Sequence, residues 1–134
     1  RVVRVDPADG ARRTIRLGGR EAFGLTAGGG ALWATVPDLD SVVRLDPRSL
    51  ETATIAVGDG PAGVGVLGRD VWVANQREST LSRIDVGTWR ASPERTLVPA
   101  NPTAVAAGGD TLWVTCVGAG QLQPVPEGFR GPGA

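Results

Sequence analysis

Acidic side chains are the groups in this sequence with the most evident capacity for chemistry. Asp38, Asp40 and Asp59 fall in stretches rich in turn-forming residues, where their carboxylates could bind a hard cation such as calcium. Their spacing lacks the glycine and the terminal glutamate of a calcium-binding loop. We therefore interpret them as solvated turn carboxylates, and we predict neither a metal site nor a cofactor.

A second polar stretch, Asn75-Gln76-Arg77-Glu78, interrupts two apolar, alternating segments. It is the most polar of the loops that the sequence predicts, and we predict it as a contact surface for a ligand or partner. The three aspartates should lie on one face of the fold, where a ligand could also bind. The predicted contact residues are Asn75, Gln76, Arg77, Glu78, Asp38, Asp40 and Asp59.

The sequence contains few of the side chains that enzymes usually use for catalysis. The chain has no His, which removes the commonest general base and metal-binding imidazole. Cys116, the single cysteine, lies in a predicted strand without a partner base, so we interpret it as a buried, inert thiol. We predict no catalytic residue and no enzymatic activity for the chain.

The segment Gly58–Gly63 matches the letters G-x-G-x-x-G of a dinucleotide-binding loop. That function requires a helix immediately afterwards, with its amide groups facing the pyrophosphate. Here Pro61 is followed by Val64 and Val66 in alternation, which predicts a strand instead. We interpret the glycines as a turn.

Composition favours a folded, turn-rich domain. The 134 residues include 20 Gly and 10 Pro, yet 41% are hydrophobic, more than a disordered tail would carry. The formal net charge is zero, which argues against a nucleic-acid partner because such surfaces need excess cations. The sequence has no long apolar run, so we predict no membrane insertion.

An internal repeat organises the chain. Trp33, Trp72 and Trp113 follow one another at intervals of 39 and 41 residues, each directly after Leu or Val. Asp46 and Asp85 follow the first two tryptophans by 13 residues. Catalysis needs one constellation rather than one residue type in every repeat, so we interpret these tryptophans and aspartates as structural: core residues and turn residues, respectively.

Each period resolves into four short strands separated by turn formers. In the middle copy we expect strands at about 62–67, 70–75, 80–85 and 95–98. The first strand of each copy alternates apolar residues with Gly, Ala or Thr, as expected where strands converge on a crowded axis. Four antiparallel strands per 40 residues with one aromatic is typical of a β-propeller blade, so we predict an all-β fold.

About three blades are present. We expect two outer strands of one blade at 1–18, whole blades at 19–58 and 59–99, an inner partial blade at 100–126, and a tail or linker at 127–134. A ring needs at least four blades. The chain is therefore either a piece of a longer propeller, which we favour, or half of a six-bladed ring completed by a homodimer.

The middle copy resembles a known family. Ala62-Gly-Val-Gly-Val66, Asp70-Val-Trp-Val-Ala-Asn75 and Thr80-Leu-Ser-Arg-Ile-Asp85 are similar to the repeats of bacterial YVTN-type, YncE-like propellers. The resemblance covers about residues 1–126. It implies the propeller fold and slightly favours an extracytoplasmic location, but the fold alone does not define a function.

Two classes of function follow from the resemblance. One is a non-catalytic binding, scaffold or sensor module within a larger bacterial protein, which we favour. The other is a fragment of an enzyme similar to the streptogramin B lyases, whose blades are related and which use a catalytic His with a divalent metal. This chain has no His, so the residue would have to come from blades outside it. No signature for binding pyrroloquinoline quinone is present.

Overall fold

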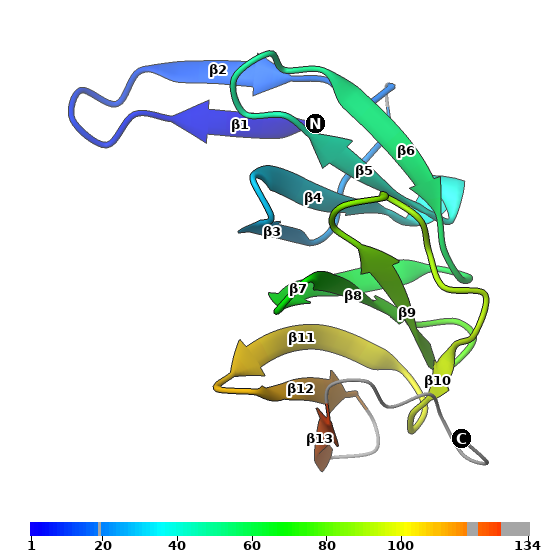
Figure 1. The fold of residues 1–134 in the computed structure, drawn as a ribbon. Helices are drawn as coiled ribbons and strands as arrows, with labels where there is room; N and C mark the ends of the chain where they lie inside the picture. The colour runs from blue at the N-terminus through cyan, green and yellow to red at the C-terminus, as the bar shows by residue number, and fades with distance from the viewer. Residues whose placement is uncertain (19, 118–120, 127–134) are drawn as a thin grey trace.

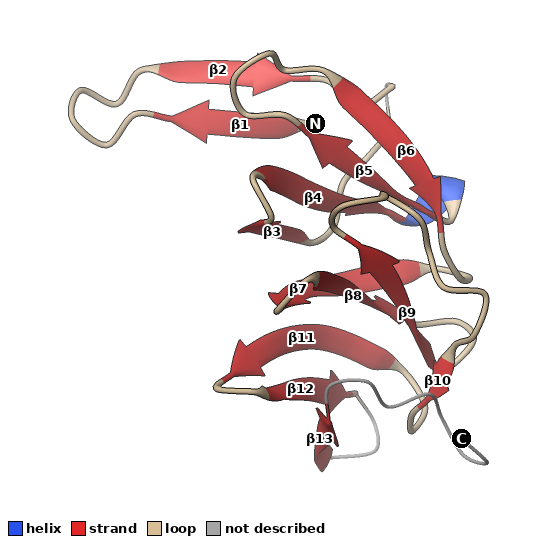
Figure 2. Ribbon diagram, viewed as in Figure 1, coloured by secondary structure: helices blue, strands red, loops and turns tan. Residues whose placement is uncertain are grey.

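The computed structural model describes residues 1–18, 20–117 and 121–126, which form four antiparallel sheets (Figure 1). Figure 2 shows that strands and turns make up nearly all of the described chain, with one short 3₁₀ turn, η1 (Pro37–Leu39). No helix in the described part is long and apolar enough to cross a membrane. The all-β fold class predicted from the repeat is therefore confirmed.

Two of the sheets have four strands each, joined in sequence order by hairpins. The first blade has the order β3-β4-β5-β6 and the second β7-β8-β9-β10. The strands of the first blade are β3 (Leu25–Gly28), β4 (Ala31–Val36), β5 (Ser41–Leu45) and β6 (Thr52–Ala56). Those of the second are β7 (Pro61–Leu67), β8 (Asp70–Asn75), β9 (Thr80–Asp85) and β10 (Thr96–Leu97).

The chain begins and ends with smaller sheets. At the start, β1 (Val2–Val5) pairs with β2 (Arg12–Ile15). The last sheet has the order β11-β12-β13, and its strands are β11 (Pro102–Gly108), β12 (Thr111–Cys116) and β13 (Gln121–Pro126). The domain boundaries stay predictions, and the predicted tail, 127–134, lies outside the described residues.

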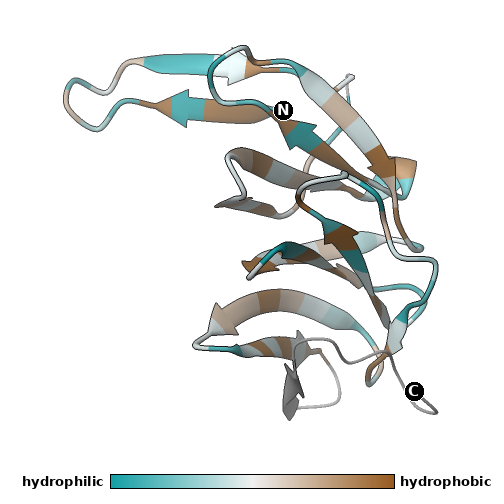
Figure 3. Cartoon of the chain, viewed as in Figure 1, coloured by the Kyte–Doolittle hydropathy of each residue, from teal (hydrophilic) through white to brown (hydrophobic). Residues whose placement is uncertain are grey.

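The sheets stack in chain order as a fan, with a core between each neighbouring pair (Figure 1). Figure 3 shows why: apolar and polar residues alternate along many strands, so each sheet offers apolar faces to its neighbours. Trp33 lies in the core between the two four-stranded blades and Trp72 in the core of the next pair. They are 0% and 1% exposed, whereas Trp113 on the last sheet is 37% exposed.

Small residues allow the innermost strands to approach closely. A Cβ atom added to Gly24 would lie 2.5 Å from the carbonyl oxygen of Ala62 in the next blade. At the equivalent repeat position, a Cβ on Gly63 would lie 2.6 Å from the Cα of Ala104. Both distances are shorter than real contacts, so glycine at this position permits the backbone-to-backbone packing that the repeat predicts.

An aspartate opens the same turn after three equivalent strands. The backbone N–H groups of Arg48 and Ser49 donate to Asp46 Oδ1 at 2.8 and 3.1 Å, and Gly87 and Thr88 donate to Asp85 Oδ1 at 2.7 and 3.0 Å. Asp6 accepts in the same way from Ala8 at 2.9 Å. These bonds lower the pKa values of Asp46 and Asp85 below the ordinary value, since they favour the charged carboxylate. The aspartates are turn residues in the structure.

Candidate functional site

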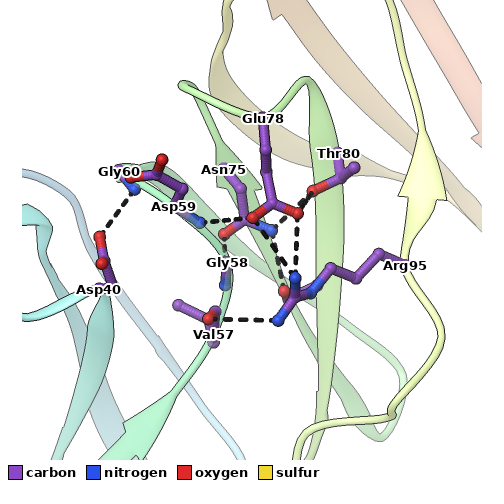
Figure 4. Close-up of polar contacts among 10 residues, drawn as sticks. Asp40, Val57, Gly58, Asp59, Gly60, Asn75, Glu78, Thr80 and Arg95 are labelled. Atoms are coloured by element: carbon purple, nitrogen blue, oxygen red, sulfur yellow. Dashed lines mark hydrogen bonds and ion pairs between the residues drawn. The ribbon is translucent and has the colours of Figure 1, made fainter.

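Three loops meet at one rim of the fan, beside the seam between the two four-stranded blades. They are the β4–β5 loop that contains η1 and ends at Asp40, the link 57–60 from β6 to β7, and the β8–β9 loop at 76–79. Figure 4 shows their side chains converging. The structure thus brings together Asp40, Asp59 and Glu78, which come from loops that are distant in sequence.

Asn75 forms the buried centre of this rim. Its side-chain Oδ1 accepts a hydrogen bond from the backbone N–H of Gly58 at 3.1 Å. Its Nδ2 donates to the hydroxyl groups of Thr80, at 3.1 Å, and Ser82, at 2.8 Å. Asn75 is 0% exposed, so its amide holds the link between blades instead of facing a partner.

The burial of Asn75 has a signal in the sequence that our prediction missed. Asn75 stands three residues after Trp72, and the residues three after Trp33 and Trp113 are Val36 and Cys116. All three are buried. A position that holds Val and Cys in sister repeats faces a core, which the polarity of the loop alone conceals.

Glu78 is the most heavily bonded carboxylate of the rim. It accepts from the backbone N–H of Asp59 at 2.7 Å, from the Thr80 hydroxyl at 2.8 Å and from Arg95 Nη1 at 3.1 Å. Partial burial raises the pKa of this carboxyl. The hydrogen bonds from Asp59 and Thr80 and the charge of Arg95 together lower the pKa by more, so the net shift is downward. Glu78 is therefore held as a carboxylate that braces three segments.

Arg95 and Asp40 bind the same link from either side. Arg95 Nη2 donates to the carbonyl oxygen of Val57 at 3.4 Å, and the backbone N–H of Gly60 donates to Asp40 Oδ1 at 3.0 Å. The backbone N–H of Val57 also donates to the carbonyl of Asp40 at 3.0 Å. The link is thereby fixed at both of its ends.

The remaining predicted contact residues lie on the surface of the rim. Arg77 Nη1 and Asp59 Oδ1 form an ion pair at 3.5 Å, with side chains 61% and 54% exposed. Gln76 donates to the Thr103 hydroxyl at 3.5 Å. Asp38 is exposed on η1. A loose, solvated ion pair of this kind contributes little to stability, so its side chains can rearrange for a partner.

The described residues form neither a cluster that could bind a metal ion nor a reactive thiol. No group of three or more His, Cys, Asp and Glu side chains there could hold a metal ion. Cys116 is buried in the core beside Trp72, and burial raises the pKa of its thiol. A buried thiol with a raised pKa is a poor nucleophile because little thiolate forms.

Sequence reasoning also missed a stack between blades. Trp89, in the turn after β9, lies with its ring centroid 4.1 Å from the guanidinium carbon of Arg44 on β5. The same guanidinium lies 5.8 Å from the ring of Trp33. Such cation–π contacts contribute about 0.5–2 kcal/mol. Trp89 falls outside the repeat of the other three tryptophans, so spacing gave it no role.

Comparison with known proteins confirms the fold. Virginiamycin B lyase from Staphylococcus aureus, in a catalytically inactive histidine-to-alanine variant with quinupristin, matches with a TM-score of 0.76 and 21% identity, over 96% of this chain and 49% of that chain. The chain has the fold of a β-propeller. Streptogramin B lyase also matches, with a TM-score of 0.72, 15% identity, and coverage of 92% of this chain and 47% of that chain.

A solved structure of a different protein also resembles the chain. Hydrazine synthase of Kuenenia stuttgartiensis matches with a TM-score of 0.75 and 20% identity, over 82% of this chain and 34% of that chain. The chain therefore spans between about a third and a half of these three proteins. No protein-family model matches the sequence, and no curated protein does. Likeness at this identity shows the fold alone.

Proposed function

We propose that this chain is a non-catalytic β-propeller module of the YVTN type, which presents a rigid rim for contact with a partner. The observation that carries the proposal is the bonding of the rim. Asn75, Glu78 and Arg95 all bind backbone groups of the 57–60 link. These bonds give the three side chains a role in holding the backbone of the link.

The contact surface is formed by the outer residues of the same rim. Asp59 and Arg77 are exposed and offer one carboxylate and one guanidinium side by side. The backbone beneath Asp59 is fixed by Glu78. A pair of exposed charges on a fixed backbone suits recognition of a polar partner, because the backbone is already ordered and loses little conformational entropy on binding.

A lyase fragment is the second candidate, and the likeness to virginiamycin B lyase favours it. The catalytically inactive form of that enzyme carries alanine in place of a histidine. This chain has no histidine. An activity of that kind would therefore require residues from outside these 134 positions.

Turnover separates the two candidates. We would incubate the purified chain with quinupristin and millimolar Mg²⁺, with active virginiamycin B lyase as the positive control, and follow the substrate by chromatography. We expect no turnover by the chain. Turnover that is abolished by chelating the metal would overturn the proposal.

Amide hydrogen exchange tests the rigid rim directly. The N–H groups of Gly58, Asp59 and Gly60 each donate to a side chain, so we expect them to exchange far more slowly than that of Asp38, an exposed residue in the first turn of η1. Exchange of these three amides at the rate of an open loop would show that the rim is mobile, and the proposal would fail.

A further inference from the structure

The outer edge of β6 is a row of backbone groups that no other strand covers. β6 is the fourth strand of its blade and pairs only with β5; Figure 1 shows it at the outer margin of the blade. All four strands of this blade are described, and a packed core lies on each side of its sheet. The open edge therefore belongs to a finished blade.

Two hydrogen bonds fix which groups of β6 face outward. Before the strand, the N–H of Asp46 donates to the carbonyl of Glu51 at 2.9 Å, and after it the N–H of Val57 donates to the carbonyl of Asp40 at 3.0 Å. Antiparallel strands bond at alternate residues. The residues whose backbone groups turn outward are therefore Thr52, Thr54 and Ala56. All three are exposed, and within the described part of the chain their outward groups have no hydrogen-bond partner.

This edge lacks the features that usually prevent strands from pairing with other chains. Natural edge strands are short, or they carry charges or prolines. The outer strand of the second blade, β10, has only two residues. The outer strand β2 is protected by charge: residues 12–16 read RRTIR, whereas residues 52–56 read TATIA. The two stretches are equivalent because each begins six residues after a turn aspartate, Asp6 or Asp46. At the three positions where the first stretch has arginine, β6 has threonine or alanine.

The edge of β6 is also self-complementary. Its outward residues are spaced two apart, with Thr54 in the middle. If two such edges run antiparallel about a twofold axis at Thr54, Thr52 of each strand lies opposite Ala56 of the other. Every outward N–H then faces an outward C=O. No charged residue of either strand is brought against another.

We propose that a second copy of this chain pairs with this edge, β6 against β6, so that the first blades of two copies form one continuous sheet. Each copy donates three backbone hydrogen bonds and accepts three. The register places Glu51 of each copy opposite Val57 of the other, whose carbonyl accepts a hydrogen bond from Arg95. The carboxylate beside the strand thus meets a cation of the other copy. The contact uses the same surface on both copies, so it closes at a dimer.

Charge explains why β6 pairs in this way and β2 does not. In the equivalent twofold register, Arg12 of one β2 strand would lie opposite Arg16 of the other, and like charges directly opposite one another are destabilising. An extended segment of another protein can add to a free edge through the same backbone groups. The match of β6 to its own antiparallel copy favours the second copy as the occupant. The contact does not use Asp59 or Arg77, so it is independent of the function proposed for the rim.

Solution mass is the first test. Because the contact is a single strand of each copy, the mass measured by light scattering should rise with concentration, from the 13.8 kDa of one copy toward twice that value. Thr54→Pro removes the central outward N–H and none of the bonds to β5. It should raise the dissociation constant about tenfold or more, because two of the bonds between copies are lost.

The matched control is Thr14→Pro. Thr14 is exposed and stands at the equivalent position of β2, so this variant removes the same group from an edge outside the proposed contact. Its dimer should be as strong as that of the parent chain. Circular dichroism should show that both variants are folded.

A charge exchange tests the position of the twofold axis. Thr54→Lys and Thr54→Glu each place two like charges opposite one another, so each variant alone should dimerise more weakly than the parent chain, by up to about fivefold. Mixed in equal amounts, the two variants should form the mixed dimer in preference to either homodimer, as native mass spectrometry would show. These exposed substitutions also keep the test valid if Thr54→Pro does not fold.

Cross-linking tests the register directly. Opposed residues in a hydrogen-bonded antiparallel pair have Cα atoms about 5.5 Å apart, which is within disulfide reach. In a Cys116→Ser background, which removes the chain's own free thiol, Thr54→Cys should form a disulfide-linked dimer on oxidation. Thr14→Cys in the same background should not.

Three results would overturn the proposal. One is a monomeric mass at all concentrations up to the millimolar range, even if the edge then accepts an extended peptide from another protein. Another is a mass that rises beyond two copies. The third is a dimer that neither Thr54→Pro nor the charged variants weaken and that does not cross-link through position 54.

Discussion

Replacing Asn75 with alanine should destabilise the chain strongly, although the residue is polar and ends a strand beside a loop. The substitution removes three hydrogen bonds, to Gly58, Thr80 and Ser82. The two hydroxyl oxygens lose a donor, but each hydroxyl keeps its own proton to donate, as Thr80 already does to Glu78. The buried N–H of Gly58 has no such freedom and loses its acceptor.

The magnitude follows from these separate effects. An orphaned buried N–H costs about 1–3 kcal/mol, and each hydrogen bond lost between partners that can rearrange costs about 0.5–1 kcal/mol. We therefore expect the free energy of unfolding to fall by about 2–5 kcal/mol. With a urea slope of ~2 kcal/mol per molar, the midpoint should fall by roughly 1–2.5 M.

Urea denaturation followed by tryptophan fluorescence, at one fixed protein concentration, measures the change. Gln76→Ala is the matched control because Gln76 is the next residue, is only partly buried and makes a single 3.5 Å bond. It should cost less than about 1 kcal/mol. Equal, small effects for both variants would show that Asn75 does not hold the link, and the account of the rim would be wrong.

Three further predictions concern the core and the carboxylates. Trp72→Ala should lower the free energy of unfolding by about 3–5 kcal/mol, because the indole is 1% exposed; an unchanged melting temperature would contradict its place in the core. Glu78 has a lowered pKa, so its contribution to stability is present above the unfolded-state pKa and is lost as pH falls through the folded-state pKa. Glu78→Gln should accordingly lose less stability than the parent chain on acidification from about pH 6 to pH 3, and equal losses would refute the shift. Cys116, with its buried thiol of raised pKa, should react with iodoacetamide only when urea unfolds the chain, as mass spectrometry would show; rapid native alkylation would contradict its burial.

The strands could be predicted from the sequence because they depend on local alternation and on turn residues that recur. In the second blade the predicted strands at 62–67, 70–75 and 80–85 differ from the observed ones by at most one residue. The predicted fourth strand, 95–98, is shorter in the structure, at Thr96–Leu97. It pairs with only one neighbour, so it has the weakest support from the sheet.

The candidate site was less predictable because its bonds join segments far apart in the chain. Arg95 reaches the carbonyl of Val57 across 38 residues, and no local pattern marks such a contact. The polarity of the 75–78 loop identified the right segment but not which side chains point inward. Only alignment of the repeats separates Asn75, at a core position, from the exposed Arg77.

The turns after Asp6, Asp46 and Asp85 share a detail with a consequence for how such chains can vary. The fourth residue after each aspartate has a positive φ: Gly10 at 74°, Leu50 at 64° and Trp89 at 60°. Each also donates its N–H to the aspartate carbonyl, at 2.8–2.9 Å. The hairpin therefore keeps its shape although the residue at this position ranges from glycine to tryptophan. At Trp89 the left-handed backbone costs about 1–2 kcal/mol, and the stack of the indole on Arg44 offsets this cost. The residue at this position can therefore change during evolution without a change in the rest of the blade.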